Sequence, residues 1–225
     1  MGDVLIEDGK ISAVGSNLSA KNAKVIDCSG KMIIPGGIDT HTHMQLPFMG
    51  TYAIDDFDSG TKAAISGGTT SHIDFAIPTQ TETLTQAYNQ WRDWADPKVN
   101  CDYTLHSAIT SWNKDTKDHM KRMVENGVQS FKFFMAYNNV LRLDDISMYY
   151  AMDYARELGC ICIVHAENGD IIQMNQEKLL KLGITGPEGH YLSRPPSVEA
   201  EATHRVITIA EHANCPVYIV HLMSR

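Results

Sequence analysis

The stretch DDISMYYAMDYARELGCICIVH, residues 144–165, decides the fold because it predicts a helix followed at once by a buried strand. Asp144 is a suitable N-cap, and Gly159 follows the last apolar position, as it does after many helices. The run 161–165 is apolar until it ends on His165, which indicates a strand. The apolar positions of the helix share one face: Met148, Ala151, Met152, Ala155 and Leu158.

The same alternation of strand and helix covers most of the chain. Six segments predict strands, with helical stretches between them: 37–39, 69–76, 102–109, 130–134, 161–165 and 217–220. Such alternation predicts a parallel sheet, because each parallel crossover needs a covering helix. An open doubly wound sheet and a (β/α)₈ barrel both fit, although no G-x-G-x-x-G follows any strand. A closed barrel takes about 250 residues. As a barrel, the chain is expected to hold six of eight strands and to be truncated.

Residues 1–35 predict a separate small sheet. Asp8-Gly9 lies between the strand-like runs 4–7 and 11–14 and is a hairpin signal. Further strands are predicted at 25–27 and 32–34. A few short strands cannot bury a face alone, so their partner strands are expected outside this chain. We therefore expect residues 1–35 to be part of a small β domain and 36–225 to form an incomplete barrel, in a chain truncated at both ends.

Composition and charge argue against several classes of protein. The formal net charge of −8 at pH 7 is unlike that of a nucleic-acid-binding surface. No apolar stretch approaches the roughly 20 residues of a membrane span. The five cysteines are odd in number and lie mostly in apolar runs, as free thiols do in a reducing compartment. We expect a cytoplasmic protein that binds neither nucleic acid nor a membrane.

Histidines follow the candidate strands. In His41-Thr42-His43, residues two apart on an extended backbone point to the same side, so both imidazoles can hold one divalent metal. A lone His-x-His is a weak signal, and for any one histidine taken singly a hydrogen-bonded core or rim position is the favoured interpretation. His165 and His221, however, end two further apolar strands. In a barrel, the C-terminal strand ends converge on one mouth, where active sites are built.

Lys132 is the most informative residue because it lies within the aromatic run 130–134. A lysine in apolar surroundings either pairs with an acid or loses its charge. An uncharged amine can add carbon dioxide, and the resulting carbamate is an anion able to bridge two metal ions. The alternative is a salt bridge to an acidic neighbour such as Asp74. Asp74 itself is expected either to support a metal ligand or to be structural.

The long Gly- and Pro-containing stretch 183–196 predicts a loop. Loops of this length are often functional or lie at interfaces. We therefore expect His190 and Arg194, which lie within it, to contact another subunit.

Four motifs resemble those of the dihydropyrimidinase and hydantoinase family of the amidohydrolase superfamily, over essentially all 225 residues. They are HTH at 41–43, SFKFFMAY at 130–137, VHAENG at 164–169, and GPEGH at 186–190 followed by SRP at 193–195. The resemblance implies a (β/α)₈ TIM-like barrel with part of a small N-terminal β-sandwich.

The resemblance also implies roles for the candidate residues. His41 and His43 would bind one divalent ion, expected to be zinc, and His165 and His221 a second. Lys132, as its carbamate, would bridge the two ions. Tyr137 matches the family tyrosine that contacts the substrate and stabilises the developing oxyanion. The catalytic aspartate of the family is expected beyond residue 225, so these 225 residues alone are expected to be inactive.

The implied activity is hydrolysis of the cyclic amide bond of 5,6-dihydropyrimidines (dihydrouracil, dihydrothymine) or hydantoins to N-carbamoyl amino acids, in pyrimidine catabolism, by a homotetramer. One alternative is a non-catalytic adaptor resembling the collapsin response mediator proteins, which have lost metal-binding positions. Another is a different cyclic amidohydrolase, such as allantoinase or dihydroorotase. The five ligand positions argue against the adaptor, and the run 134–137 favours the dihydropyrimidinase branch.

Overall fold

The computed structural model describes residues 2–19 and 21–224 of the chain. The ranges predicted from the sequence, 1–35 and 36–225, include Met1, Ala20 and Arg225, which lie outside the described residues. The chain divides into two compact units, Met1–Pro35 and Gly36–Arg225. Each is described separately below.

The first unit contains one antiparallel hairpin, formed by β1 (Asp3–Glu7) and β2 (Lys10–Gly15). Asp8 and Gly9 form its turn with φ angles of 49° and 73°, the left-handed backbone that a tight Asp-Gly turn requires. The strands expected at 25–27 and 32–34 are wrong, since both segments are irregular. A strand needs a hydrogen-bonded neighbour, and none of the described residues supplies one to these segments.

The second unit contains a six-stranded parallel sheet in the order β10-β9-β8-β7-β6-β3. Its strands are β3 (Gly37–Asp39), β6 (Thr69–Ala76), β7 (Asp102–Ala108), β8 (Ser130–Phe134), β9 (Ile161–His165) and β10 (Val217–Ile219). The predicted strands are confirmed to within one residue. Apart from the hairpin of β4 (Pro47–Phe48) and β5 (Thr51–Tyr52), which lies between β3 and β6 in the chain, the described strands follow one another across the sheet in chain order. The described part of the sheet therefore lacks the order reversal of a doubly wound fold and forms a curled half-barrel.

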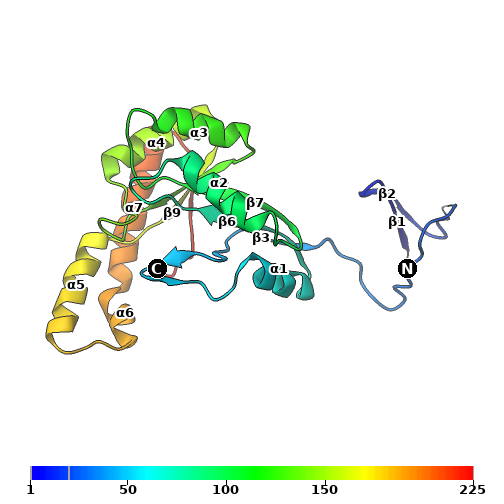
Figure 1. The fold of residues 1–225 in the computed structure, drawn as a ribbon, viewed down its shortest axis with the longest axis horizontal. Helices are drawn as coiled ribbons and strands as arrows, with labels where there is room; N and C mark the ends of the chain where they lie inside the picture. The colour runs from blue at the N-terminus through cyan, green and yellow to red at the C-terminus, as the bar shows by residue number, and fades with distance from the viewer. Residues whose placement is uncertain (1, 20, 225) are drawn as a thin grey trace. The chain divides into compact units, whose positions relative to one another are not determined.

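Helices connect and cover these strands (Figure 1). They are α1 (Phe57–Ser66), α2 (Leu84–Ala95), α3 (Thr116–Glu125), α4 (Asp145–Glu157), α5 (Gly169–Lys181), α6 (Glu188–Ser193) and α7 (Pro196–Ala213). The small hairpin of β4 and β5 precedes α1. None of the helices among the described residues has the length and apolar character needed to cross a membrane.

The stretch 183–196 is more ordered than the loop expected there, because it contains α6 and the start of α7. Proline opens both helices: Pro187 is the N-cap of α6, and Pro196 is the first residue of α7. Proline is well tolerated at these positions, where an N–H would have no partner within the helix. The α6 helix packs against α5 (Figure 1).

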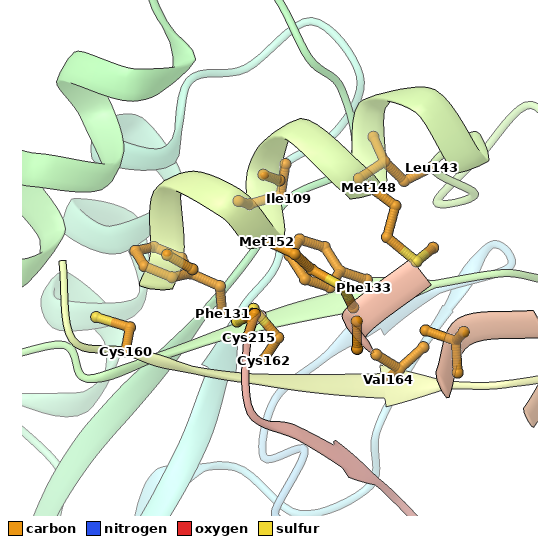
Figure 2. Packing of buried hydrophobic residues seen from close by; sticks show 14 of the residues in the cluster. Ile109, Phe131, Phe133, Leu143, Met148, Met152, Cys160, Cys162, Val164 and Cys215 are labelled. Carbon is orange, nitrogen blue, oxygen red and sulfur yellow. The ribbon is translucent and has the colours of Figure 1, made fainter. Parts of the chain in front are cut away.

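Alternation along the strands separates a helix-covered face from a concave face. Phe131 and Phe133 are fully buried in one cluster with Met148 and Met152 of α4, and Figure 2 shows Phe133 near Met152. The intervening side chain of Lys132 must point the other way, because successive residues of a strand face opposite sides. The concave face therefore receives Lys132, together with Phe134 and Phe75.

Candidate metal centre

The first predicted histidine pair lies in the loop after β3. His41 Nε2 and His43 Nε2 are 3.2 Å apart, and both rings pack against Phe75. Burial, followed by the charge of Lys132, lowers the pKa of His41 to about 3 and that of His43 to about 4. Both imidazoles are therefore neutral near pH 7, the state in which they bind metals. Nδ1 of His43 is buried without a hydrogen-bond partner among the described residues.

The second pair combines two strands that are neighbours in the sheet. His165 is the last residue of β9, and His221 lies two residues beyond β10, with a left-handed φ of 40°. His165 Nδ1 and His221 Nε2 are 3.0 Å apart. Burial, then His165 and Lys132, lower the pKa of His221. The ring of His221 also lies 5.9 Å from that of His41, so the two pairs occupy one site.

Lys132 is 1% exposed, and its Nζ lies 5.3 Å and 5.2 Å from the ring centroids of Phe75 and Phe134. Burial lowers the pKa of Lys132 to about 7, so a large fraction of the amine is uncharged at neutral pH. The salt bridge considered with Asp74 is not observed, because that carboxylate is engaged elsewhere. The ring of Phe75 also contacts both histidines of the first pair, and that of Phe134 lies 5.9 Å from the ring of His165, so the amine shares aromatic neighbours with both pairs.

These donors fit divalent metal ions. Nitrogen ligands about 2.0–2.1 Å from a tetrahedral zinc ion are about 3.3 Å apart, close to the separations within the two pairs. The neutral rings of His41 and His43 suit the same role. Among the described residues, no three side chains of the His, Cys, Asp and Glu types form a complete metal site. Each pair therefore needs a further ligand, and a carbamate on Lys132 would supply an oxygen to each.

Asp74 fixes the loop that carries the first pair. Its Oδ2 accepts hydrogen bonds from Thr42 Oγ1 at 2.8 Å and from the Met44 backbone N–H at 2.9 Å. It is fully buried in β6, and burial raises its pKa to about 6 despite these hydrogen bonds. Of the two roles expected for Asp74, the structure supports an indirect one, in which the carboxylate holds the backbone around His43.

Tyr137 lies three residues beyond β8 and closes one side of the site. Its ring centroid is 5.2 Å from that of His165 and 5.3 Å from that of Phe48 in β4. Its φ of 65° is left-handed, an uncommon conformation for a bulky residue that often marks a functional position. Burial, then the charge of Glu167, raises the pKa of Tyr137, so the phenol keeps its proton and can donate a hydrogen bond.

Two charged residues contact the site although the sequence indicated no role for them there. Glu167 Oε2 lies 2.6 Å from His165 Nε2, and Glu167 Oε1 lies 3.4 Å from Arg194 Nε. The side chain of Arg194 is 13% exposed and pairs with Glu167 of the same chain, while its expected contact with another subunit stays a prediction. The spacing of His165 and Glu167, two residues apart at a strand end, was the available signal, since it places both side chains on one side.

Comparisons with known proteins agree with this geometry. Residues 32–221 match the model of the amidohydrolase family. A dihydropyrimidinase of Rattus norvegicus is 54% identical over 99% of this chain and 44% of its own length. Dihydropyrimidinase-related protein 5 of Homo sapiens is 49% identical over 99% of this chain and 40% of its own length. A crystal structure of a D-hydantoinase superposes with a TM-score of 0.96 at 43% identity, covering 99% of this chain and 48% of that one.

The chain thus spans less than half the length of these proteins. The family match covers most of the chain, and the curled parallel sheet agrees with the TIM-like barrel expected from the sequence. This chain belongs to the amidohydrolase family.

Proposed function

We propose that this protein hydrolyses the cyclic amide bond of 5,6-dihydropyrimidines or hydantoins, giving N-carbamoyl amino acids. The observation that carries the proposal is the arrangement of two histidine pairs near a buried lysine, whose pKa is lowered to about 7, on the concave face of the sheet. The relatives named dihydropyrimidinase and D-hydantoinase support the same substrate class.

In this proposal His41 and His43 hold one divalent ion, His165 and His221 hold another, and carbamylated Lys132 bridges them. Zinc suits these ligands, because it binds imidazole nitrogen and carboxylate-like oxygen in tetrahedral sites. When bound, such ions supply Lewis-acid polarisation of a carbonyl and lower the pKa of water towards neutrality. Lys132 is buried beside Phe75 and Phe134, and this burial favours the uncharged amine needed for carbamate formation.

Tyr137 is proposed to bind the carbonyl oxygen of the ring that opens. Its protonated phenol can donate a hydrogen bond to this oxygen as negative charge develops on it. Phe48, in contact with the ring of Tyr137, would pack against the apolar carbons of the substrate. We further propose that the protein acts in the cytoplasm as a homotetramer, with residues 1–35 in a small β-sandwich and 36–225 in the barrel.

A turnover assay tests the proposed function. The full-length protein is incubated with dihydrouracil and, separately, with hydantoin, before and after treatment with a chelator. We expect ring opening, loss of activity on chelation, and recovery on adding Zn²⁺. A protein that binds no metal and opens neither ring would instead support the adaptor role, for which the similarity to a dihydropyrimidinase-related protein is the argument.

A further inference from the structure

A carboxylate outside the predicted ligand set contacts a histidine of the second pair. Glu167 accepts a hydrogen bond from His165 over 2.6 Å, and the two side chains are only 14% and 11% exposed. The opposite oxygen of Glu167 faces Arg194. Since water has little access to this contact, the hydrogen bond is stronger than it would be on the surface.

The contact determines which ring nitrogen of His165 carries the proton. An ionised carboxylate can only accept hydrogen bonds, so Nε2 of His165 must be the donor. In a neutral imidazole, Nδ1 then carries a lone pair. This nitrogen is the one that lies 3.0 Å from Nε2 of His221. The lone pair therefore points into the space between the two histidines.

We infer that Glu167 is a positioning residue for the second metal ion, holding His165 in the tautomer and orientation in which Nδ1 can bind a divalent cation. A carboxylate on the far nitrogen of a histidine fixes the ring and makes the ligating nitrogen more basic. The inference rests on the proposed function, since it takes the second pair as a metal site.

Arg194 extends this chain of contacts to the segment after α6. Its Nη1 donates to Ser193 Oγ at 3.1 Å and to the carbonyl oxygen of His190 at 3.4 Å, while its Nε faces Glu167. Arg194 thus contacts the carboxylate oxygen of Glu167 that does not face His165. The segment around 190–194, which is distant in sequence from the histidines, contributes to the site through this guanidinium.

A zinc titration tests the inference. The full-length protein, freed of metal, is titrated with Zn²⁺ against a competing chelator as wild type, Glu167→Ala and Glu167→Gln. We expect the affinity for the second ion to fall about 10–100-fold in Glu167→Ala, with the first ion unaffected. Glu167→Gln should lose less affinity for the second ion, because the amide oxygen of glutamine can still accept a hydrogen bond from Nε2 of His165. The exposed Glu177 of α5 is the matched control, and Glu177→Gln should bind both ions as wild type does.

The tautomer of His165 provides a second readout, which needs neither metal nor activity. In ¹⁵N spectra of the metal-free, histidine-labelled protein, wild-type His165 should carry its proton on Nε2, and Glu167→Ala should shift it towards a mixture of tautomers. The inference would be overturned if Glu167→Ala and Glu167→Gln bound both ions with wild-type affinity. It would also be overturned if His165 of the wild type carried its proton on Nδ1. If the wild type binds no zinc, the proposed function fails, while these spectra still decide whether Glu167 sets the tautomer.

Discussion

The two histidine pairs of the metal centre are held in different ways. His41 and His43 come from one short loop, whose backbone Asp74 fixes through Thr42 and Met44. His165 and His221 are 56 residues apart in the chain and meet because β9 and β10 are paired. The first pair therefore depends on one loop and one carboxylate of β6, whereas the second depends on the alignment of two strands.

This difference shows why a motif can reveal one half of a site and hide the other. The spacing of His41 and His43 is visible within three residues of sequence. The second pair exists only once the sheet has formed, and its ring-to-carboxylate contact has no counterpart in the first pair, where Asp74 contacts the backbone and a hydroxyl. The first pair is supported by the carboxylate of Asp74 and the second by the pairing of β9 with β10. Substitutions that affect both pairs, or only one of them, can therefore show how much each support contributes.

Replacing Lys132 should have the largest effect, because its amine lies near both pairs. Lys132→Met keeps an apolar chain of similar length but cannot form a carbamate. We expect the variant to lose both metal affinity and turnover. Each loss should exceed the roughly 10–100-fold that follows the removal of a residue hydrogen-bonded to a metal ligand. Zinc content by atomic spectroscopy and dihydrouracil turnover measure this. Lys178→Met, on the exposed side of α5, is the control. Two bound ions and full turnover in Lys132→Met would contradict the proposed bridge.

Tyr137→Phe should have the next largest effect. It should lower the rate of ring opening without changing metal binding or stability. Removing one hydrogen-bond donor to a developing oxyanion lowers kcat by about 10²–10³-fold. The phenylalanine ring can keep the contacts with His165 and Phe48, so zinc content and melting temperature should stay near those of the wild type. Tyr149→Phe, on the surface of α4, serves as the control. Loss of zinc together with activity would show instead that the phenol supports the second pair structurally.

Asp74→Asn should have the smallest effect and should concern the first pair. Burial raises the folded-state pKa of Asp74 from 3.8 to about 6, so between about pH 4 and 6 the folded protein binds a proton that the unfolded chain has released. This group therefore makes the metal-free wild type less stable as the pH rises through that window. Asparagine cannot titrate, so the variant should lack this decline, which is at most about 1.4 kcal/mol per pH unit.

Urea unfolding in the presence of a chelator, repeated from pH 4 to pH 7, measures this difference. Subtracting the variant from the wild type at each pH removes the contributions of all other titrating groups that the substitution leaves unchanged. If the difference in the free energy of unfolding does not change between about pH 4 and pH 6, Asp74 is ionised throughout this range, as a carboxylate on the surface would be.

The fold was largely predictable because strand and helix periodicities are local. Each predicted strand of the sheet is found, and Asp144 caps α4 by accepting from the Ser147 backbone N–H. The segments 25–27 and 32–34 were misread because apolar content alone does not make a strand when no neighbouring strand is available. His221 was expected to end its strand but lies two residues beyond β10 with a left-handed φ. Histidine has no strong preference for this conformation, so the sequence did not indicate it.

The sequence identified residues of the site only where the residue type is unusual for its neighbours in the chain. A lysine among aromatic residues stands out in a sequence, so Lys132 could be identified without a structure. Glu167 and Arg194 are charged residues in ordinary polar surroundings, and only their tertiary placement brings them to His165. The left-handed backbone of Tyr137 is likewise a result of the packing around it, since tyrosine has no preference for that conformation.

The consecutive order of the six parallel strands also bears on how the molecule folds. Each strand adds to the edge left by the strand before it, and the longest connection is the one from β9 to β10, which contains α5, α6 and α7. Such local pairing allows the sheet to grow during synthesis, as the chain leaves the ribosome from its N-terminus. The loop of His41 and His43 can then form early, while the contact between His165 and His221 waits for β10, so the second pair of the metal centre forms after the first.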